Sequence, residues 1–173
     1  MENFTNSILL PEELPEIDAK TFNPLDKKYL KLTFIRMAVF FVVLVGGFIS
    51  FIFISEGNIP KTPLIIISSV LAVLLIFSVV YTFLSFPRKG YLVREKDISF
   101  QRGLITYKLT TVPFNRIQHV EVNQGVLAKL FALSSLKLFT AGGNASDLSI
   151  HGLPRDVALN LKAFLSEKIS EHE

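Results

Sequence analysis

The stretches MAVFFVVLVGGFISFIFI (Met37–Ile54) and LIIISSVLAVLLIFSVVYTFLSF (Leu64–Phe86) contain no charged residue. As helices they are roughly 27 and 34 Å long, against about 30 Å of hydrocarbon in a bilayer. Neither has the charged face of a helix that lies on a membrane surface, and both are longer than most buried helices of soluble proteins. We therefore predict two transmembrane helices, residues 32–54 and 64–86, joined by a short external loop, residues 55–63.

Basic residues lie outside both apolar runs. They are Lys27, Lys28, Lys31 and Arg36 before the first run, and Arg88, Lys89, Arg94 and Lys96 after the second. The connecting loop offers only Glu56 and Lys61. By the positive-inside rule, both termini are expected in the cytoplasm.

Small residues recur at a spacing of four in the two runs. Gly46 and Ser50 lie in the first run, and Ser68 and Ala72 in the second. Small residues allow close approach of helices in lipid, so these four are candidates for helix–helix packing. The alternative is that glycine and serine are simply common in membrane helices. Neither run has a histidine or an acidic residue at mid-span, which argues against a proton or ion pathway.

The first 31 residues are predicted to form a cytoplasmic N-terminal tail. This segment is acidic up to Asp26, and Pro11, Pro15 and Pro24 interrupt regular structure, so we expect it to be largely extended. It lacks the basic start of a signal peptide.

After Pro87 the composition changes, and residues 88–173 are predicted to form a cytoplasmic, mainly β domain. Short runs of strand character alternate with turns, and Pro154 can open a C-terminal amphipathic helix. The expected strands are 91–95, 97–101, 104–112, 117–124, 136–140 and 147–151, with a helical turn at 126–133. In the third strand, Ile105, Tyr107 and Leu109 are expected to share one face. A hairpin turn is expected at Gly142-Gly143-Asn144.

Several of these segments resemble the YdbS-like bacterial pleckstrin-homology (PH) family of membrane proteins. The resemblance rests on Asn115–Val120, Asn123–Gly125, Leu127–Phe131, Phe139–Gly143 and Phe22–Tyr29, together with the two apolar runs. The sequence differs from the family pattern at Val126, Ala132 and His151, and these differences are expected to affect only turns. The resemblance implies a two-pass protein of the bacterial cytoplasmic (inner) membrane with a PH-like split barrel, capped by the C-terminal helix. Members of this family often occur beside a longer paralogue with repeated PH units, so the resemblance makes such a paralogue one candidate partner.

No catalytic or cofactor-binding pattern is present in the sequence. Cysteine is absent, and the three histidines, His119, His151 and His172, match no metal-ligand spacing. The formal net charge of +3 lacks the concentrated basic stripe of a nucleic-acid-binding protein. We therefore expect no enzyme activity, no catalytic or metal site, no cofactor and no nucleic-acid partner.

The remaining functional signal is a basic surface next to the second apolar run. Its candidate residues for lipid or partner contact are Arg88, Lys89, Arg94, Lys96 and Arg102. The leading hypothesis is a membrane-anchored interaction module, a scaffold or subunit of a membrane assembly, whose partner is another membrane protein or a second copy. The alternative is a sensor of anionic membrane lipid, since each cation near an anionic leaflet contributes about 1 kcal/mol. A solvated flank that only sets orientation is the simplest reading of the same charges.

Overall fold

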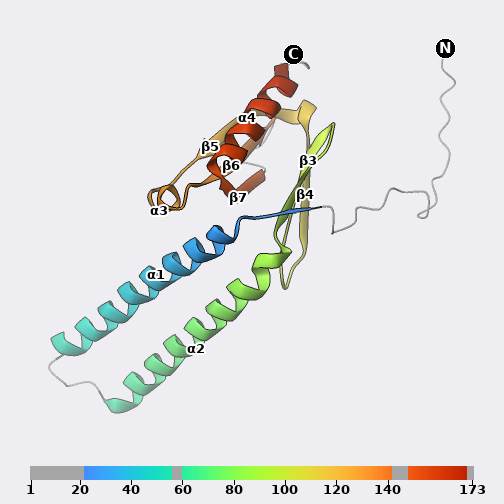
Figure 1. The fold of residues 1–173 in the computed structure, drawn as a ribbon. Helices are drawn as coiled ribbons and strands as arrows, with labels where there is room; N and C mark the ends of the chain where they lie inside the picture. The colour runs from blue at the N-terminus through green and yellow to red at the C-terminus, as the bar shows by residue number, and fades with distance from the viewer. Residues whose placement is uncertain (1–21, 56–59, 142–147, 171–173) are drawn as a thin grey trace, which may run out of the picture.

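The computed structural model describes residues 22–55, 60–141 and 148–170. Two long antiparallel helices, α1 (Lys27–Ile54) and α2 (Lys61–Ser85), form a hairpin that carries a β domain at one end (Figure 1). Only 6% of the most apolar window of α1 and 0% of that of α2 is buried by the rest of the protein. Core helices of a soluble protein would be mostly buried, so these exposed apolar surfaces fit a lipid environment.

Polar groups within the two helices are satisfied locally. The hydroxyls of Ser50, Ser68 and Ser78 donate to the carbonyls of Gly46, Leu64 and Leu74 at 2.9, 2.8 and 2.7 Å. Such back-bonding matches the need to satisfy every polar group inside hydrocarbon. At the start of α1, the Asp26 carboxylate accepts a hydrogen bond from the Lys28 amide at 2.7 Å and caps the helix.

The β domain contains two antiparallel sheets. Sheet A has the order β1-β2-β3-β4 and sheet B the order β5-β6-β7. The strands of sheet A are β1 (Asn23–Pro24), β2 (Gly90–Val93), β3 (Asp97–Arg102) and β4 (Lys108–Pro113). The strands of sheet B are β5 (Ile117–Asn123), β6 (Leu133–Thr140) and β7 (Leu148–Pro154). Short 3₁₀ turns, η3 (Phe86–Arg88) and η4 (Phe114–Arg116), lead into β2 and β5.

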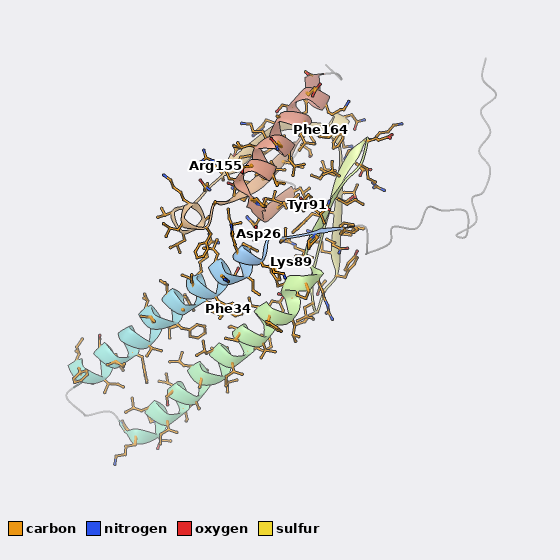
Figure 2. The ribbon with its side chains drawn as sticks, in the orientation of Figure 1. Asp26, Phe34, Lys89, Tyr91, Arg155 and Phe164 are labelled. Atoms are coloured by element: carbon orange, nitrogen blue, oxygen red, sulfur yellow. The ribbon has the colours of Figure 1, made fainter. Side chains whose placement is uncertain are left out.

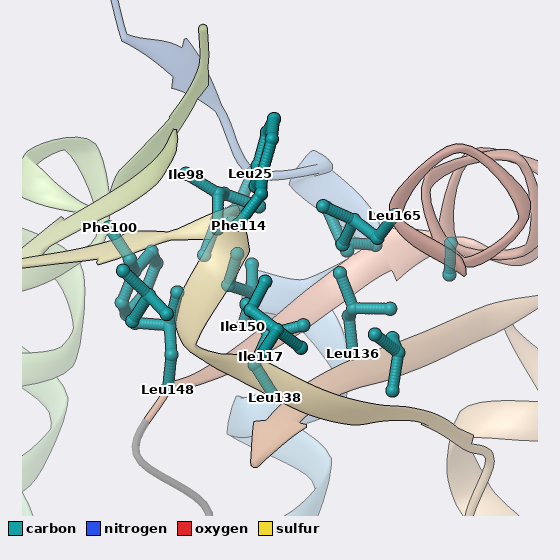
Figure 3. Packing of buried hydrophobic residues seen from close by; sticks show 14 residues of the cluster. Leu25, Ile98, Phe100, Phe114, Ile117, Leu136, Leu138, Leu148, Ile150 and Leu165 are labelled. Carbon is teal, nitrogen blue, oxygen red and sulfur yellow. The ribbon is translucent and has the colours of Figure 1, made fainter. Parts of the chain in front are cut away.

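The core lies between the two sheets and the C-terminal helix α4 (Arg155–Ser170). Ile98 from sheet A and Leu136 and Ile150 from sheet B are fully buried there, and Figure 3 shows where they lie in the cluster. Ala158 and Leu165 are the fully buried residues of α4, so this helix closes the open side of the domain. This arrangement confirms the predicted membrane hairpin followed by a PH-like β domain with a C-terminal helix.

The segment just before α1 belongs to the domain. Phe22 and Leu25 are buried, and β1 pairs with β2 through Asn23↔Tyr91 and Pro24↔Gly90. The sequence predicts a largely extended tail up to Asp26, and within it Asn23–Pro24 form an edge strand of sheet A, while α1 begins at Lys27 instead of residue 32. The apolar residues in this segment are too few to produce a periodic pattern, so their burial was not predictable from alternation.

The first turn of α1 also packs against β7. Gly152 has φ +80°, and a Cβ built on it would lie 2.3 Å from Cγ of Tyr29. Only glycine permits both this backbone conformation and this close approach. The Asp26 amide donates to the Gly152 carbonyl at 3.3 Å. The membrane hairpin is therefore joined to the domain through packing as well as through the chain.

The third expected strand was wrong at its start. β4 begins at Lys108, and residues 104–107 form the turn between β3 and β4. Ile105 and Tyr107 are 79% and 65% exposed in this turn, so they do not share a packed face with Leu109. Gly103, with φ +127°, turns the chain directly after Arg102, and the next strand starts four residues later than alternation suggested. The expected turn at Gly142-Gly143-Asn144 lies outside the described residues.

Candidate juxtamembrane basic site

A cavity of about 370 Å³ lies where the last turns of α2 meet sheet A. Its lining residues are Tyr81, Ser85, Lys89, Arg102, Gly103, Thr106 and Lys108. Three of these residues are cationic and none is Asp or Glu. We name this the basic cavity; its composition suits an anionic group that carries several acceptor oxygens.

The antiparallel register brings the three cations together. Arg102 on β3 lies directly opposite Lys108 on β4. Lys89 immediately precedes Gly90, which pairs with Gln101, the neighbour of Arg102. Like charges that face each other across a ladder are destabilising. Sheet pairing therefore concentrates positive charge in the basic cavity, although the repulsion between these cations is destabilising.

Lys89 is half-buried at the junction between α2 and the domain (Figure 2). Burial, and secondarily the charge of Arg102, lowers the pKa of its ammonium group. Its Nζ lies 5.9 Å from the centre of the Tyr29 ring, a distance at which the ring face attracts a cation. Among the described residues, no carboxylate forms an ion pair with Lys89, Arg102 or Lys108.

Arg88 lies in η3 beside the basic cavity. Its side chain is exposed, and Nη1 donates to the Leu104 carbonyl at 3.1 Å. This bond ties the end of α2 to the turn between β3 and β4. Arg88 therefore positions that turn and leaves most of its guanidinium facing solvent.

Arg94 and Lys96 lie at the other end of sheet A. The register Val93↔Ile98 places both in the turn between β2 and β3, away from α2. Arg94 is neutralised there, because its Nε donates to the Asp97 carboxylate at 2.8 Å. The structure therefore brings Arg88, Lys89 and Arg102 to one end of the sheet and separates Arg94 and Lys96 from them.

Sequence reasoning missed Lys108 as a member of this group. The expected third strand began at residue 104, which hid the pairing between Lys108 and Arg102. The signal that could have found it is Gly103 followed by a four-residue turn, since residues on either side of a hairpin turn face each other. A turn of that length would have predicted adjacent cations.

The four residues that we considered for helix–helix packing do not meet at a single contact between α1 and α2. A Cβ built on Gly46 meets nothing within 4 Å, so Gly46 does not hold the helices together within this chain. Ser50 is exposed and bonds only to its own helix. Ser68 and Ala72 line an apolar gap of about 240 Å³ between α1 and α2, shared with Phe41 and other apolar residues. Their packing role stays a prediction.

A second, smaller cavity of about 50 Å³ lies between α1 and sheet B, lined in part by Arg36, Ser135 and His151. Burial lowers the pKa of the His151 imidazole, and the cations that add to this effect are Arg36, Lys137, Arg102 and Lys89, in that order. Positive charge from α1, from both sheets and from the residue after η3 thus converges on the same end of the domain.

The other described histidine is placed differently. His119 stacks on Phe139 with ring centres 4.2 Å apart, and its Nε2 lies 3.8 Å from the Glu121 carboxylate. In the part of the chain that the structure describes, no group of three or more histidine or acidic residues could hold a metal ion.

An exposed apolar hairpin, a two-sheet domain with a closing helix and a basic cavity at their junction define a membrane protein with a PH-like domain. The chain belongs to the bacterial PH domain family, whose model matches residues 34–169, which include most of α1, all of α2 and nearly the whole β domain. The UPF0699 transmembrane protein YdbS of Bacillus subtilis (strain 168) is 34% identical over 64 residues, 37% of this chain. That match covers 36% of the relative, so it spans about a third of its length. No solved structure matches.

Proposed function

We propose that this chain is a non-enzymatic, membrane-anchored interaction module whose PH-like domain binds anionic lipid headgroups in the basic cavity. The observation that carries this proposal is the grouping of Lys89, Arg102 and Lys108 without an acidic partner among the described residues. A headgroup phosphate would supply the missing negative charge and the acceptor oxygens.

The position of the basic cavity favours a lipid over a dissolved anion. Tyr81 and Ser85 belong to the last turns of α2, so the cavity opens beside the helix that we expect to cross the bilayer. We infer from the positive-inside rule that this end faces the cytoplasmic leaflet of the inner membrane, with both termini in the cytoplasm. Each cation near an anionic leaflet contributes about 1 kcal/mol.

The test uses the full chain in detergent, with bound phospholipid counted by native mass spectrometry. The double variant Arg102→Gln/Lys108→Gln removes two charges from the basic cavity, and Arg94→Gln/Lys96→Gln removes two from the far end as a matched control. At about 1 kcal/mol per charge, we expect the first variant to lose its preference for phosphatidylglycerol over phosphatidylcholine by about 30-fold. The control should keep it. Equal losses in both variants, or none in either, would refute the proposal.

Association with another membrane protein is a second candidate function, favoured by the surface of the hairpin. Gly46 and Gly47 have open space around them, and an apolar gap separates α1 from α2 near Ser68 and Ala72. A transmembrane helix of a longer PH-repeat paralogue, or of a second copy, could pack on such a surface. Crosslinking in native membranes tests this: Gly46→Leu should abolish a crosslinked species, and recovery of monomer alone from wild type would exclude the candidate.

A further inference from the structure

The most exposed apolar side chains of the β domain occur at two places. Outside α1 and α2, Val126 and Leu130 are 85% and 77% exposed, and Ile105 and Tyr107 are 79% and 65% exposed. Val126 and Leu130 belong to the short helix α3 (Val126–Leu130), and the other two to the turn between β3 and β4. Exposed apolar side chains that gather in a patch mark contact sites, and the location of these two pairs indicates what they contact.

The helix α3 is fixed against the start of α1. Its Ala128 is buried together with Leu32 of α1 and Leu133 of β6. Val126 and Leu130 are four residues apart, so they share one face of α3, and Ala128 lies on another. Leu32 lies five residues before the uncharged run that begins at Met37. The exposed face of α3 therefore sits close to the level at which α1 enters hydrocarbon.

The turn between β3 and β4 is fixed against the end of α2. Arg88 donates to the Leu104 carbonyl, and Gly103 and Thr106 line the basic cavity together with Tyr81 of α2. Tyr81 lies within the apolar run, so this turn reaches the level of lipid-facing residues. Tyrosine is common at that level, because its ring is apolar and its hydroxyl is polar.

The two elements lie at the same end of the hairpin. Figure 1 shows α3 beside the first turns of α1 and the turn between β3 and β4 beside the end of α2, on opposite sides of the pair. Each carries a cation next to its apolar residues, Lys129 on α3 and Lys108 after the turn, and both are exposed. Apolar residues with adjacent cations are the pattern of segments that rest in the headgroup region.

We propose that α3, through Val126 and Leu130, and the β3–β4 turn, through Ile105 and Tyr107, insert into the boundary between headgroups and acyl chains of the bilayer that α1 and α2 cross. With the helical hairpin between them, these two contacts hold the domain in one orientation on the membrane surface. The opening of the basic cavity then faces the headgroups. The inference depends on the membrane location of the hairpin and not on any charge preference of the basic cavity.

The sequence has no tryptophan, so a single introduced tryptophan reports on one position. The variants Val126→Trp and Ile105→Trp place it in the two contacts, and Leu159→Trp on the exposed side of α4 is the control. Each full-length variant is reconstituted in zwitterionic vesicles with lipid brominated near the headgroup end of its acyl chains. For insertion about 5–10 Å deep, we expect bromolipid to lower emission at positions 126 and 105 by about half or more. The emission of the control, Leu159→Trp, should be quenched by aqueous iodide instead.

Folding is checked by circular dichroism, and Leu130→Trp and Tyr107→Trp replace any variant that does not fold. Quenching by iodide but not by bromolipid at both contacts would overturn the proposal. A blue shift that depends on protein concentration without bromolipid quenching would also overturn it, because a second copy would then cover these residues. Zwitterionic vesicles separate this outcome from the proposed headgroup preference, which requires anionic lipid.

Discussion

The two ends of sheet A carry similar charge in the sequence but differ in ion pairing and in distance from the helices. At the α2 end, Lys89, Arg102 and Lys108 line a cavity without an acidic partner among the described residues. At the far end, Arg94 pairs with Asp97 at 2.8 Å in a turn that faces away from the helices. Charge count alone therefore cannot identify a functional surface. Pairing and distance from the bilayer separate the two ends, and the following predictions test each factor.

The largest expected effect concerns the glycine that shapes the α2 end. Gly103 has φ +127°, and a Cβ there would lie 1.9 Å from the Thr106 carbonyl oxygen. Gly103→Ala should lower the free energy of unfolding by about 2 kcal/mol or more, since positive-φ strain adds to a clash with the backbone. Thermal unfolding of the detergent-solubilised chain measures it.

Gly125→Ala is the matched control for Gly103→Ala. Gly125 has φ −71° and open space around it, so this change should stay within about 1 kcal/mol. If both substitutions changed the free energy of unfolding equally, the turn between β3 and β4 would have to shift to make room for the added methyl group.

The next largest effect is on lipid binding. Lys108→Glu puts a negative charge into the basic cavity, whereas Lys96→Glu makes the same change at the far end. A reversal changes the charge by two, so Lys108→Glu should weaken phosphatidylglycerol binding by about 2 kcal/mol at low salt. The difference should shrink as salt screens exposed charges. If Lys96→Glu has the same effect, distance from the helices does not matter and the comparison fails.

Some parts of the fold and of the basic cavity follow from the sequence alone, and others do not. The uncharged runs predicted the hairpin because a helix must be long and apolar to cross a bilayer, and few helices of soluble proteins meet both conditions. Strand alternation located most of the β domain, and Pro154 with an amphipathic pattern located its closing helix. It failed at residues 104–107, where apolar residues lie in a turn, and at Phe22 and Leu25, which pack from outside any periodic run. The basic cavity depends on the register between Arg102 and Lys108, which a misplaced strand start concealed.

A smaller effect is expected from pH, through His151. Burial and then the charges of Arg36, Lys137, Arg102 and Lys89 hold its pKa below the ordinary value of 6.5. As the pH falls from 6.5 toward the folded-state pKa, the unfolded chain binds a proton that the native chain does not. Stability should therefore be constant above this window and decrease within it.

His151→Gln is the control for this pH dependence. It should flatten the decrease in unfolding temperature between neutral and mildly acidic pH, because glutamine does not titrate there. A wild-type chain whose unfolding temperature rises on acidification would contradict the positive environment that we assign to His151.

The smallest effect is expected at the far end, from Asp97→Asn. The Arg94–Asp97 pair is exposed enough that its loss should cost less than about 1 kcal/mol, and less still at high salt. The substitution also leaves Arg94 without its carboxylate partner, so the far end gains an uncompensated cation like those of the basic cavity. If pairing alone separated the two ends, this variant would gain affinity for phosphatidylglycerol. We expect no gain in the lipid-counting assay, because the turn that carries Arg94 faces away from the bilayer. A gain comparable to the loss in Lys108→Glu would show that pairing, and not position, separates the two ends.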